Sequence, residues 1–491
     1  MANGASDALK VRRDVWKLDT WDPILVWYAK AVAEMQSRPI NDPTSWRYQA
    51  AIHEYIRDSD PYATVADKLP SDRQRFWNQC QHSTWFFLPW HRMYLLYFEQ
   101  IVAAAVEKLG GPKDWALPYW NYSEYRSIDK VLQLPPAFYA INTPDGKPNP
   151  LRVEQRDSGL NDGVPIHFQS PEQDVDLSCL GDALFVGLAE GGHPGFGGPS
   201  TRSPRHGGGP GGGLETTPHG DMHIAVGGPA GFMSSFATAA LDPIFWLHHA
   251  NIDRLWDVWT GRAGHANPTD KNWLTQRFEF HDKDAEAVAL TPGQVLTTTV
   301  APLAYRYEDV TDPQAQPDRK LAFAVRSPVM PSASVPEMVG ATDHAVALTA
   351  SAATTASMNI VTATGPARMA MAAGPGTTRQ SAYLNIENIT SNGVPGSYAV
   401  YLDLPAGADP QQHQDLFAGT LPMFGVAEAS RPDQEHPGSG LQYVLEVSAI
   451  IERLKAQGLW DPSRLAITFV ARRQQGGYAD VQIGRVSLYY Q

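Results

Sequence analysis

The stretch that decides the fold is DPIFWLHHANIDRLWDVW, from Asp242 to Trp259. Asp242 is placed to cap a helix and Pro243 suits its first turn. Apolar residues then recur at helical spacing, which predicts a buried helix. A desolvated imidazole needs a hydrogen-bond partner or a metal ion, so His248 and His249 within this helix require an explanation.

The residues after the histidine pair support a metal-binding interpretation. Asp253 follows His249 by four positions and therefore lies one turn further along the same helical face. Arg254 follows Asp253, so a carboxylate and a cation stand beside the imidazole. Because outer carboxylates orient metal-binding histidines, we expect Asp253 to support His249.

Further histidines lie upstream in helical patterns. His219 and His223, in PHGDMH, are four residues apart and share one face of a predicted helix. His82 precedes an apolar run, and His91 lies in the first turn of the long helix that this run predicts. His53 lies in a third amphipathic pattern, SWRYQAAIHEYIRD. An H-x-x-x-H pair alone can equally be two polar residues near a surface, so the grouping carries the argument.

The ligand type narrows the choice of metal. Imidazole suits zinc, copper, iron and nickel. A di-iron bundle would need Glu-x-x-His pairs and a metalloprotease would need H-E-x-x-H, and neither motif occurs in the sequence. Six histidines in two helical groups, without a cysteine cluster, fit paired copper best.

These motifs resemble those of the type-3 copper proteins, the family of tyrosinases, catechol oxidases and hemocyanins. The segment from His82 to His91, with its F-x-x-W-H-R ending, resembles the family's second and third ligands of the first copper. The segment from His219 to His249 resembles the second copper's H-x-x-x-H followed by D-P-x-F-x-x-H-H-x-x-x-D. By this resemblance the ligand is the second histidine of the pair, His249, and His248 is its neighbour. The implied cofactor is two copper ions, held by His53, His82, His91, His219, His223 and His249.

The resemblance implies a mainly α core, a four-helix bundle that holds the dicopper centre, within a catalytic domain at residues 1–310. A glycine-rich insertion at about 186–214 interrupts this domain, and its composition predicts a flexible segment. Residues 311–491 contain β-branched and aromatic runs bounded by turn residues, which predict a β-rich, sandwich-like domain. Five isolated histidines are expected at the surface: His193, His206, His344, His413 and His436.

In the family a C-terminal domain of this kind can act as a lid that holds a bulky side chain in the substrate position. One candidate hairpin is FAGTLPMFG, which ends at Gly425. Burying one such side chain stabilises a closed state by ~1.5 to 3 kcal/mol, so the lid can open. The alternative is that Phe417, Met423 and Phe424 are core of the β domain, and no residue is singled out.

The activity implied is copper-dependent oxidation of phenols by dioxygen. Monophenols would be hydroxylated ortho to their oxygen, and o-diphenols would be oxidised to o-quinones. The phenol proton is lost most easily to a base through an ordered water. Glu215 matches the glutamate that holds such a water in plant members; the alternative is a helix-entry carboxylate favoured by the dipole. Phe245 and Met233 match the side and floor of the substrate pocket, although such residues are also ordinary core.

Two positions depart from the family pattern. Gly220 stands where many tyrosinases have an asparagine that helps polarise the water, and Ile224 is likewise apolar. Diphenol oxidation is therefore expected, while a catechol oxidase without monophenol hydroxylation remains an alternative. A hemocyanin-like oxygen-binding protein would require a permanently closed pocket. A zinc hydrolase would leave the segment from His82 to His91 unexplained.

A cysteine adjoins the first group. In fungal members, a cysteine two residues before the second ligand of the first copper is joined to it by a thioether, and Cys80 and His82 have this spacing. We expect the same bond here; the alternative is a free buried thiol.

Composition restricts the partners. The net charge of −13 argues against a nucleic acid or an anionic membrane surface. No apolar run is long enough to span a membrane, and residues 1–20 contain no apolar signal region, so we expect a cytoplasmic protein. The expected partners are dioxygen and small phenols, and a homo-oligomer is compatible with the sequence.

Overall fold

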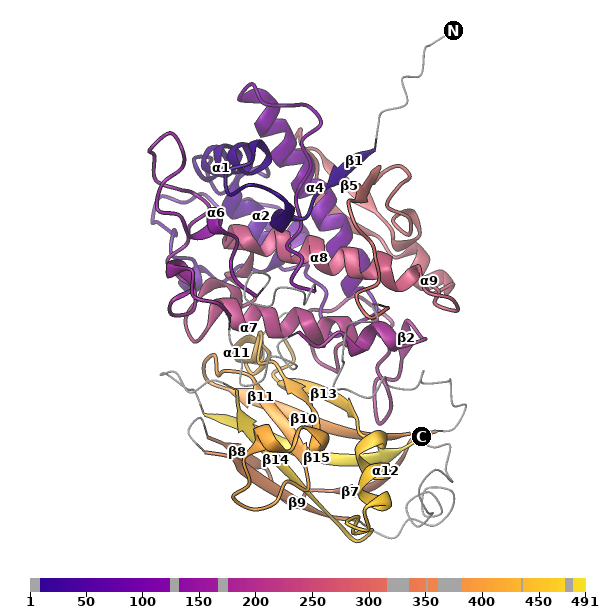
Figure 1. Ribbon diagram of the computed structural model, residues 1–491. Helices are drawn as coiled ribbons and strands as arrows, with labels where there is room; N and C mark the ends of the chain where they lie inside the picture. Colours follow the sequence, from indigo (N-terminus) through magenta and orange to yellow (C-terminus); the bar gives the residue numbers. More distant parts are fainter. Residues whose placement is uncertain are drawn as a thin grey trace.

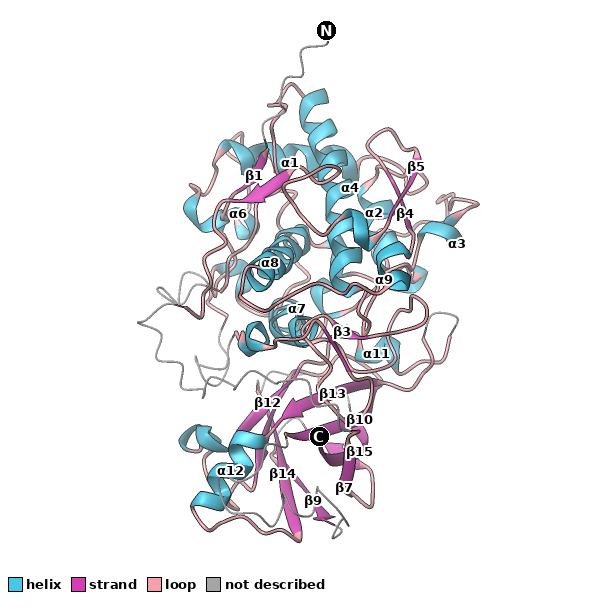
Figure 2. Ribbon diagram, turned by 90° about the vertical axis from the view of Figure 1, so that its right-hand side faces the viewer, coloured by secondary structure: helices cyan, strands magenta, loops and turns pink. Residues whose placement is uncertain are grey.

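The computed structural model describes residues 9–123, 132–166, 175–315, 335–349, 352–360, 381–433, 436–472 and 480–491. The described chain forms a helical part and a β-rich part, which lie above and below one another in Figure 1. Colouring by secondary structure separates the same two parts, with α7 and α11 at their boundary (Figure 2). Among the described residues, no helix has both the length and the apolar character needed to cross a bilayer.

Five helices build the centre of the helical part: α1 (Pro23–Gln36), α2 (Trp46–His53), α4 (Phe87–Lys108), α7 (Asp221–Gly227) and α8 (Pro243–Thr260). Shorter helices are α3 (Arg73–Phe76), α6 (Pro136–Tyr139) and α9 (Lys271–Thr275). Short strands are β1 (Lys10–Arg12), β2 (Val186–Gly187), β3 (Gly198–Pro199), β4 (Phe278–His281), β5 (Ala287–Leu290) and β6 (Tyr305–Tyr307).

Helix α8 forms where the sequence predicted it. The side chain of Asp242 accepts a hydrogen bond from the Ile244 amide at 3.1 Å, and Pro243 occupies the first turn. Almost the whole helix is buried, and the ring of Trp246 stacks on Phe98 of α4. Packing of α8 against α4 therefore sets the distance between the two histidine groups.

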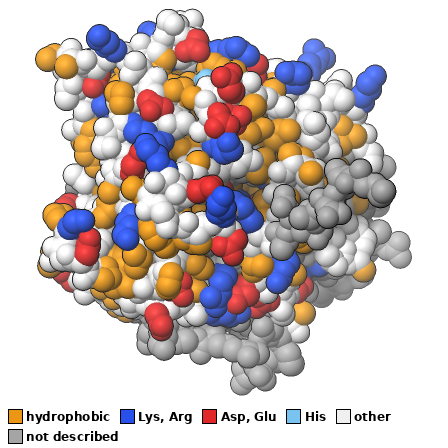
Figure 3. All heavy atoms as spheres, turned by 90° about the horizontal axis from the view of Figure 1, so that it is seen from above, with side chains coloured by type: hydrophobic (Ala, Val, Ile, Leu, Met, Phe, Trp, Pro, Cys, Tyr) orange, Lys and Arg blue, Asp and Glu red, His pale blue; other side chains and the backbone are white. Residues whose placement is uncertain are grey.

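The surface of the helical end is mixed in charge. In the view of Figure 3, basic and acidic side chains intermingle with apolar ones. Among the described residues visible on this face, neither sign of charge forms a broad continuous patch.

The β-rich part is one nine-stranded sheet in which neighbouring strands pair antiparallel. The two end strands, β12 and β13, contact each other, so the sheet is nearly closed. The predicted sandwich is thus replaced by a single curled sheet, with α12 (Ser448–Ala456) and α11 (Val426–Ala429) beside it. The strands are β7 (Glu337–Ala341), β8 (Val346–Leu348), β9 (Thr354–Ile360), β10 (Ala382–Ser391), β11 (Tyr398–Leu402), β12 (Phe417–Leu421), β13 (Leu441–Glu446), β14 (Arg464–Ala471) and β15 (Val481–Tyr490).

The glycine-rich segment, for which the composition predicts flexibility, packs between the two parts. Arg205 donates a hydrogen bond to the Ser83 carbonyl oxygen at 3.0 Å, beside the first histidine group. Pro210 forms a parallel bridge with Gln442 of β13. Close approach to other backbone explains the glycines at Gly187, Gly195, Gly198 and Gly212.

A buried ion pair joins the two parts directly. Arg472, at the end of β14, lies 3.0 Å from the carboxylate of Asp221 at the start of α7. Both side chains are buried. Since α7 carries His223, the β-rich part is anchored to the helix that presents the second histidine group.

Candidate metal centre

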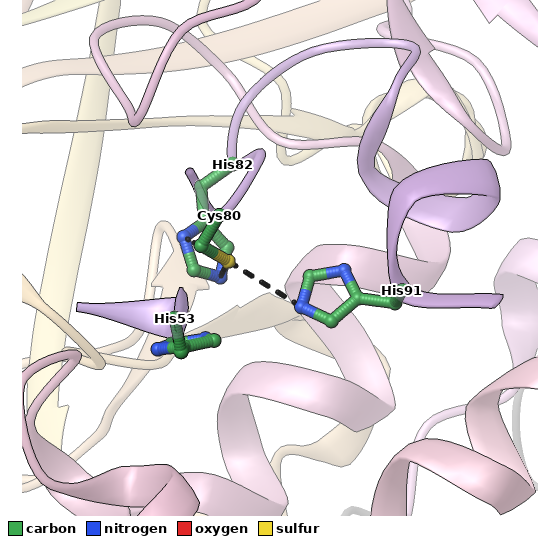
Figure 4. A group of neighbouring side chains, drawn as sticks. All are labelled: His53, Cys80, His82 and His91. Atoms are coloured by element: carbon green, nitrogen blue, oxygen red, sulfur yellow. Dashed lines mark hydrogen bonds between the residues drawn. The ribbon is translucent and has the colours of Figure 1, made fainter. Parts of the chain in front are cut away.

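The first group of candidate ligands comes together between α2 and α4. His53 ends α2, His91 is the fifth residue of α4, and Cys80 and His82 lie in the chain between these helices. Their potential ligand atoms all lie within 4.8 Å of one another, and all four residues are buried (Figure 4).

Backbone carbonyls orient two of these imidazoles. Nδ1 of His53 lies 2.8 Å from the Phe236 carbonyl oxygen, and Nδ1 of His91 lies 2.8 Å from that of Phe87. Because each Nδ1–H donates to an oxygen, each Nε2 keeps its lone pair for a metal. Nε2 of His53 is buried without a hydrogen-bond partner among the described residues, as a metal ligand lacking its ion would be.

The second group repeats this pattern with His219 in the helical turn Glu215–Gly220, His223 on α7 and His249 on α8. Nδ1 of His219 lies 2.9 Å from the Glu215 carbonyl oxygen, and Nδ1 of His223 lies 2.7 Å from that of Met233. Nε2 of His223 approaches Nε2 of His249 to 3.4 Å. With Nδ1 of His223 donating, two ring nitrogens this close in a buried site suit a shared cation.

The two groups face each other. The rings of His91 and His249 stack with centroids 4.4 Å apart and an interplanar angle of 6°. The rings of His82 and His219 lie 6.0 Å apart. The structure thus brings the six predicted ligands into one buried site from two halves of the chain.

His248 also belongs to the second group. It lies with His219, His223 and His249, with ligand atoms within 4.8 Å. Its Nδ1 is 2.9 Å from the Tyr122 hydroxyl oxygen, while its Nε2 has no partner in the described part of the chain. The second group therefore contains four histidines that could bind a metal, whereas the resemblance implied three ligands for the second copper.

Burial keeps these imidazoles neutral, which is the form that binds metal. Desolvation lowers the pKa of His53 and of His219 to about 3. Burial lowers the pKa of His82, His91 and His223 as well. At neutral pH the site therefore offers uncharged nitrogen donors.

Asp253 does not play the part that its spacing predicted. The structure gives no hydrogen bond between Asp253 and His249; the Asp253 carboxylate instead accepts from Arg92, which follows His91. It also accepts from the hydroxyls of Tyr305 and Tyr307 at 2.5 Å each. Asp253 thus ties α8 to α4 and β6, because four donors, including Arg12, occupy its oxygens.

Cys80 lies against His82. Its Sγ is 3.5 Å from Nδ1 and 3.7 Å from Nε2 of the His82 ring. The sulfur is also 3.4 Å from Nε2 of His91, and burial raises the pKa of the thiol.

The β-rich part closes the site. The ring of Phe424, which follows β12, stacks on the ring of His223 at 3.8 Å and 13°. It also meets the ring of Phe236 edge-on at 4.6 Å. Phe417, by contrast, packs on Tyr401 within the sheet. The predicted hairpin therefore reaches the histidines through Phe424, while Phe417 is partly buried and packs against the core of the sheet.

A small cavity remains beside this ring. It measures about 40 Å³, which is space for a few water molecules. Of the four predicted pocket residues, Gly220 lines it, whereas Phe245, Met233 and Ile224 are buried outside its lining. Phe245 packs on His249 at 4.3 Å. The residues that line the cavity are His82, Ser83, Gly207, Gly209, Gly211, Glu215, Thr216, His219, Gly220, Phe236, Pro422, Phe424, Ala429, Leu441, Gln442 and Tyr443.

Glu215 points one oxygen into this region. Its Oε1 accepts a hydrogen bond from the Ser83 amide at 2.7 Å, and its buried Oε2 has no partner among the residues described. Burial raises the pKa of this carboxyl group to about 8. The group can therefore exchange a proton near neutral pH.

Two features of the site were missed from the sequence. Phe236 stacks on His82 at 4.3 Å and 11°, although nothing in the spacing of GFMSSF marks it. His206 and His436, predicted at the surface, are 4% and 2% exposed and lie beside Glu54. Both histidines stand in polar, glycine- and proline-rich stretches, so local composition misplaced them.

Three protein-family models match segments of the chain. The family described as the common central domain of tyrosinase matches residues 43–182 and 188–262. The polyphenol oxidase middle domain matches residues 267–318. A domain of unknown function matches residues 335–491.

Similar proteins are known from bacteria and plants. The tyrosinase HcTyr1 of Hahella sp. (strain CCB-MM4) is 36% identical over 98% of this chain and 99% of its own length. The latent form of a polyphenol oxidase from Prunus armeniaca is 31% identical over 60% of this chain and 47% of its own length. Among solved structures, latent apple tyrosinase matches with a TM-score of 0.63 and 21% identity, covering 100% of this chain and 99% of that one.

Proposed function

Because the chain belongs to the tyrosinase family, we propose that it oxidises phenols with dioxygen, taking o-diphenols to o-quinones and hydroxylating monophenols at the ortho position. The observation that carries this proposal is the convergence of buried, neutral histidines from two halves of the chain on one site closed by Phe424.

The donor set fits two copper ions, one for each histidine group. We propose His53, His82 and His91 for one ion, and His219, His223 and His249 for the other. His249 is preferred to His248 because its Nε2 meets that of His223 and its ring stacks on His91. The bound ions would supply the route by which electrons pass from the phenol to dioxygen.

The helices α2, α4, α7 and α8 each carry one of these histidines, which supports the proposal of a four-helix bundle around the centre. Cys80 lies close enough to His82 to support a thioether between them. Such a bond would fix the ring of a histidine that lies in a loop.

The protein's own residues would position the phenol. Phe424 stacks on His223, and a phenol ring of similar shape can take its place once the lid is displaced. Glu215, with a free buried oxygen beside the cavity, would accept the phenol proton through a water molecule. Exclusion of bulk water by the surrounding rings would strengthen both interactions.

The test is oxygen consumption by the copper-loaded intact protein, given either a monophenol without a diphenol primer or a catechol. Phe424→Ala should raise the catechol rate roughly 10- to 150-fold, since burial of one such ring is worth about 1.5 to 3 kcal/mol. Phe417→Ala, which removes a partly buried ring that packs on Tyr401, is the matched control and should not raise it.

The outcomes separate the candidate functions. Uptake with both substrates establishes a tyrosinase despite Gly220. Uptake with catechol alone establishes a catechol oxidase. Reversible oxygen binding without turnover, even in Phe424→Ala, would contradict the proposal and indicate an oxygen carrier.

A further inference from the structure

A third group of potential ligands lies outside the two proposed copper sites. Glu54, His206 and His436 offer ligand atoms within 4.8 Å of one another, and their exposed fractions are 3%, 4% and 2%. Glu54 follows α2, His206 belongs to the glycine-rich segment, and His436 belongs to the β-rich part. Three segments distant in sequence thus contribute one donor each.

Outer hydrogen bonds fix both imidazoles in the same way. Nδ1 of His206 lies 2.6 Å from the Cys80 carbonyl oxygen, and Nδ1 of His436 lies 3.1 Å from a carboxylate oxygen of Asp433. An oxygen that accepts from Nδ1–H leaves the lone pair of Nε2 directed to the other side of the ring. This is how proteins orient histidines that bind metal.

Both Nε2 atoms face one carboxylate. Nε2 of His206 is 3.4 Å from Oε2 of Glu54, and Nε2 of His436 is 4.0 Å from Oε1. Nε2 of His436 is buried and has no hydrogen-bond partner among the described residues. The neutral imidazoles would turn two lone pairs toward a buried carboxylate, and this repulsion requires a cation between them. A proton in the hydrogen bond between His206 and Glu54 can serve on one side, whereas Nε2 of His436 has no such bond among the described residues, and a metal ion can serve both.

We propose that Glu54, His206 and His436 form a third metal site, separate from the copper centre, which binds one zinc ion between the helical and β-rich parts. Two imidazoles and one carboxylate are a donor set that zinc uses, with a fourth position left for water.

A second buried carboxylate lies close enough to Glu54 to interact with its charge. Glu428, at α11, is buried, and its Oε2 has no partner in the described structure, while its Oε1 accepts from Ser235. Burial, with the nearby charge of Glu54, raises the pKa of Glu428 to about 7. This crowding of carboxylates favours a cation at the site independently of the histidines.

A metal ion at this site would hold the β-rich part against the helical part. The ring of Phe236 meets that of Phe424 at 4.6 Å, that of His206 at 5.3 Å and that of His436 at 6.3 Å. A zinc ion there would therefore hold the β-rich part beside the ring that covers the copper centre. This consequence rests on the proposed role of Phe424, whereas the metal site does not.

The experiment counts metals in intact protein whose copper sites are already filled. After incubation with zinc chloride and removal of unbound metal, elemental analysis should give one zinc ion in addition to two copper ions per chain. His436→Gln should lose the zinc and keep both copper ions. His344→Gln, which alters an exposed histidine of the same β-rich part, should keep all three.

Zinc should also raise the midpoint of thermal unfolding of the wild type and of His344→Gln, but not of His436→Gln. Anomalous diffraction at the zinc edge, from wild-type crystals, should place the ion between Glu54 and the two histidines, and it decides the matter if His436→Gln does not fold. Absence of the extra zinc from the wild type, or its retention by His436→Gln, would overturn the proposal and leave an ion pair held by a proton. Neither readout depends on phenol turnover, so failure here is distinct from failure of the proposed activity.

Discussion

Gly220 shows how one missing side chain accommodates the lid. A Cβ at this position would come within 2.9 Å of Cγ of Pro422, which lies two residues before Phe424. The absence of the family's asparagine thus has a packing reason.

Gly220→Ala should push Pro422 away and raise the basal rate of catechol oxidation several-fold. Initial rates of intact, copper-loaded protein measure this effect. Gly181→Ala, at a position where a Cβ meets nothing within 4 Å, is the control. Equal rates for Gly220→Ala and the wild type would show that Pro422 does not govern access.

Glu215 permits a test of proton transfer. In a Phe424→Ala background, Glu215→Gln should lower kcat/KM for phenols by about 10²-fold or more, the usual effect of losing a general base. Gln keeps an oxygen that can accept from the Ser83 amide, so the local fold should be preserved. Glu279→Gln, which alters a surface ion pair with Arg75, should leave kcat/KM unchanged. An unchanged rate in Glu215→Gln would assign this carboxylate to structure alone.

At the scale of elements, Asp253 holds α8 against α4 and β6. The guanidinium groups of Arg92 and Arg12 both donate to Asp253, and both must remain paired because they are buried. Asp253→Asn should therefore cost about 3 to 5 kcal/mol of unfolding free energy, the usual loss when one partner of a buried pair is removed. Urea unfolding of copper-free protein measures it. Asp309→Asn, at the partly exposed pair with Lys17, should cost less than about 1 kcal/mol.

The pH dependence of this effect has a definite sign. Burial raises the pKa of Asp253, but the charges of Arg92 and Arg12 outweigh it, so the net pKa is lowered. The stabilisation is therefore complete above the unfolded pKa of about 4 and is lost as the pH falls through the lower folded value. The difference between wild type and Asp253→Asn should shrink in acid and persist at neutral pH.

At the scale of the whole molecule, features that depend on neighbouring residues could be predicted from the sequence, whereas contacts between distant segments could not. The helix from Asp242 and the paired spacing of His219 and His223 could be predicted because helical periodicity and capping are local. Phe424 reaches His223 across about 200 residues of chain, and His436 reaches Glu54 across almost 400, so only the packing of the two parts reveals these contacts. The four donors that occupy Asp253 likewise come from distant segments.

If Phe424 has the role proposed above, its stack on His223 makes the protein carry its own competitive inhibitor, tethered to the site that it blocks. Substrate can bind only to the fraction of molecules in which the ring has swung out, so the apparent KM equals the intrinsic KM divided by that fraction. Low urea concentrations, which weaken apolar contacts before the chain unfolds, should therefore activate the intact enzyme and leave Phe424→Ala unaffected. The rate of turnover in the intact protein then measures the fraction of molecules in which Phe424 has left the site.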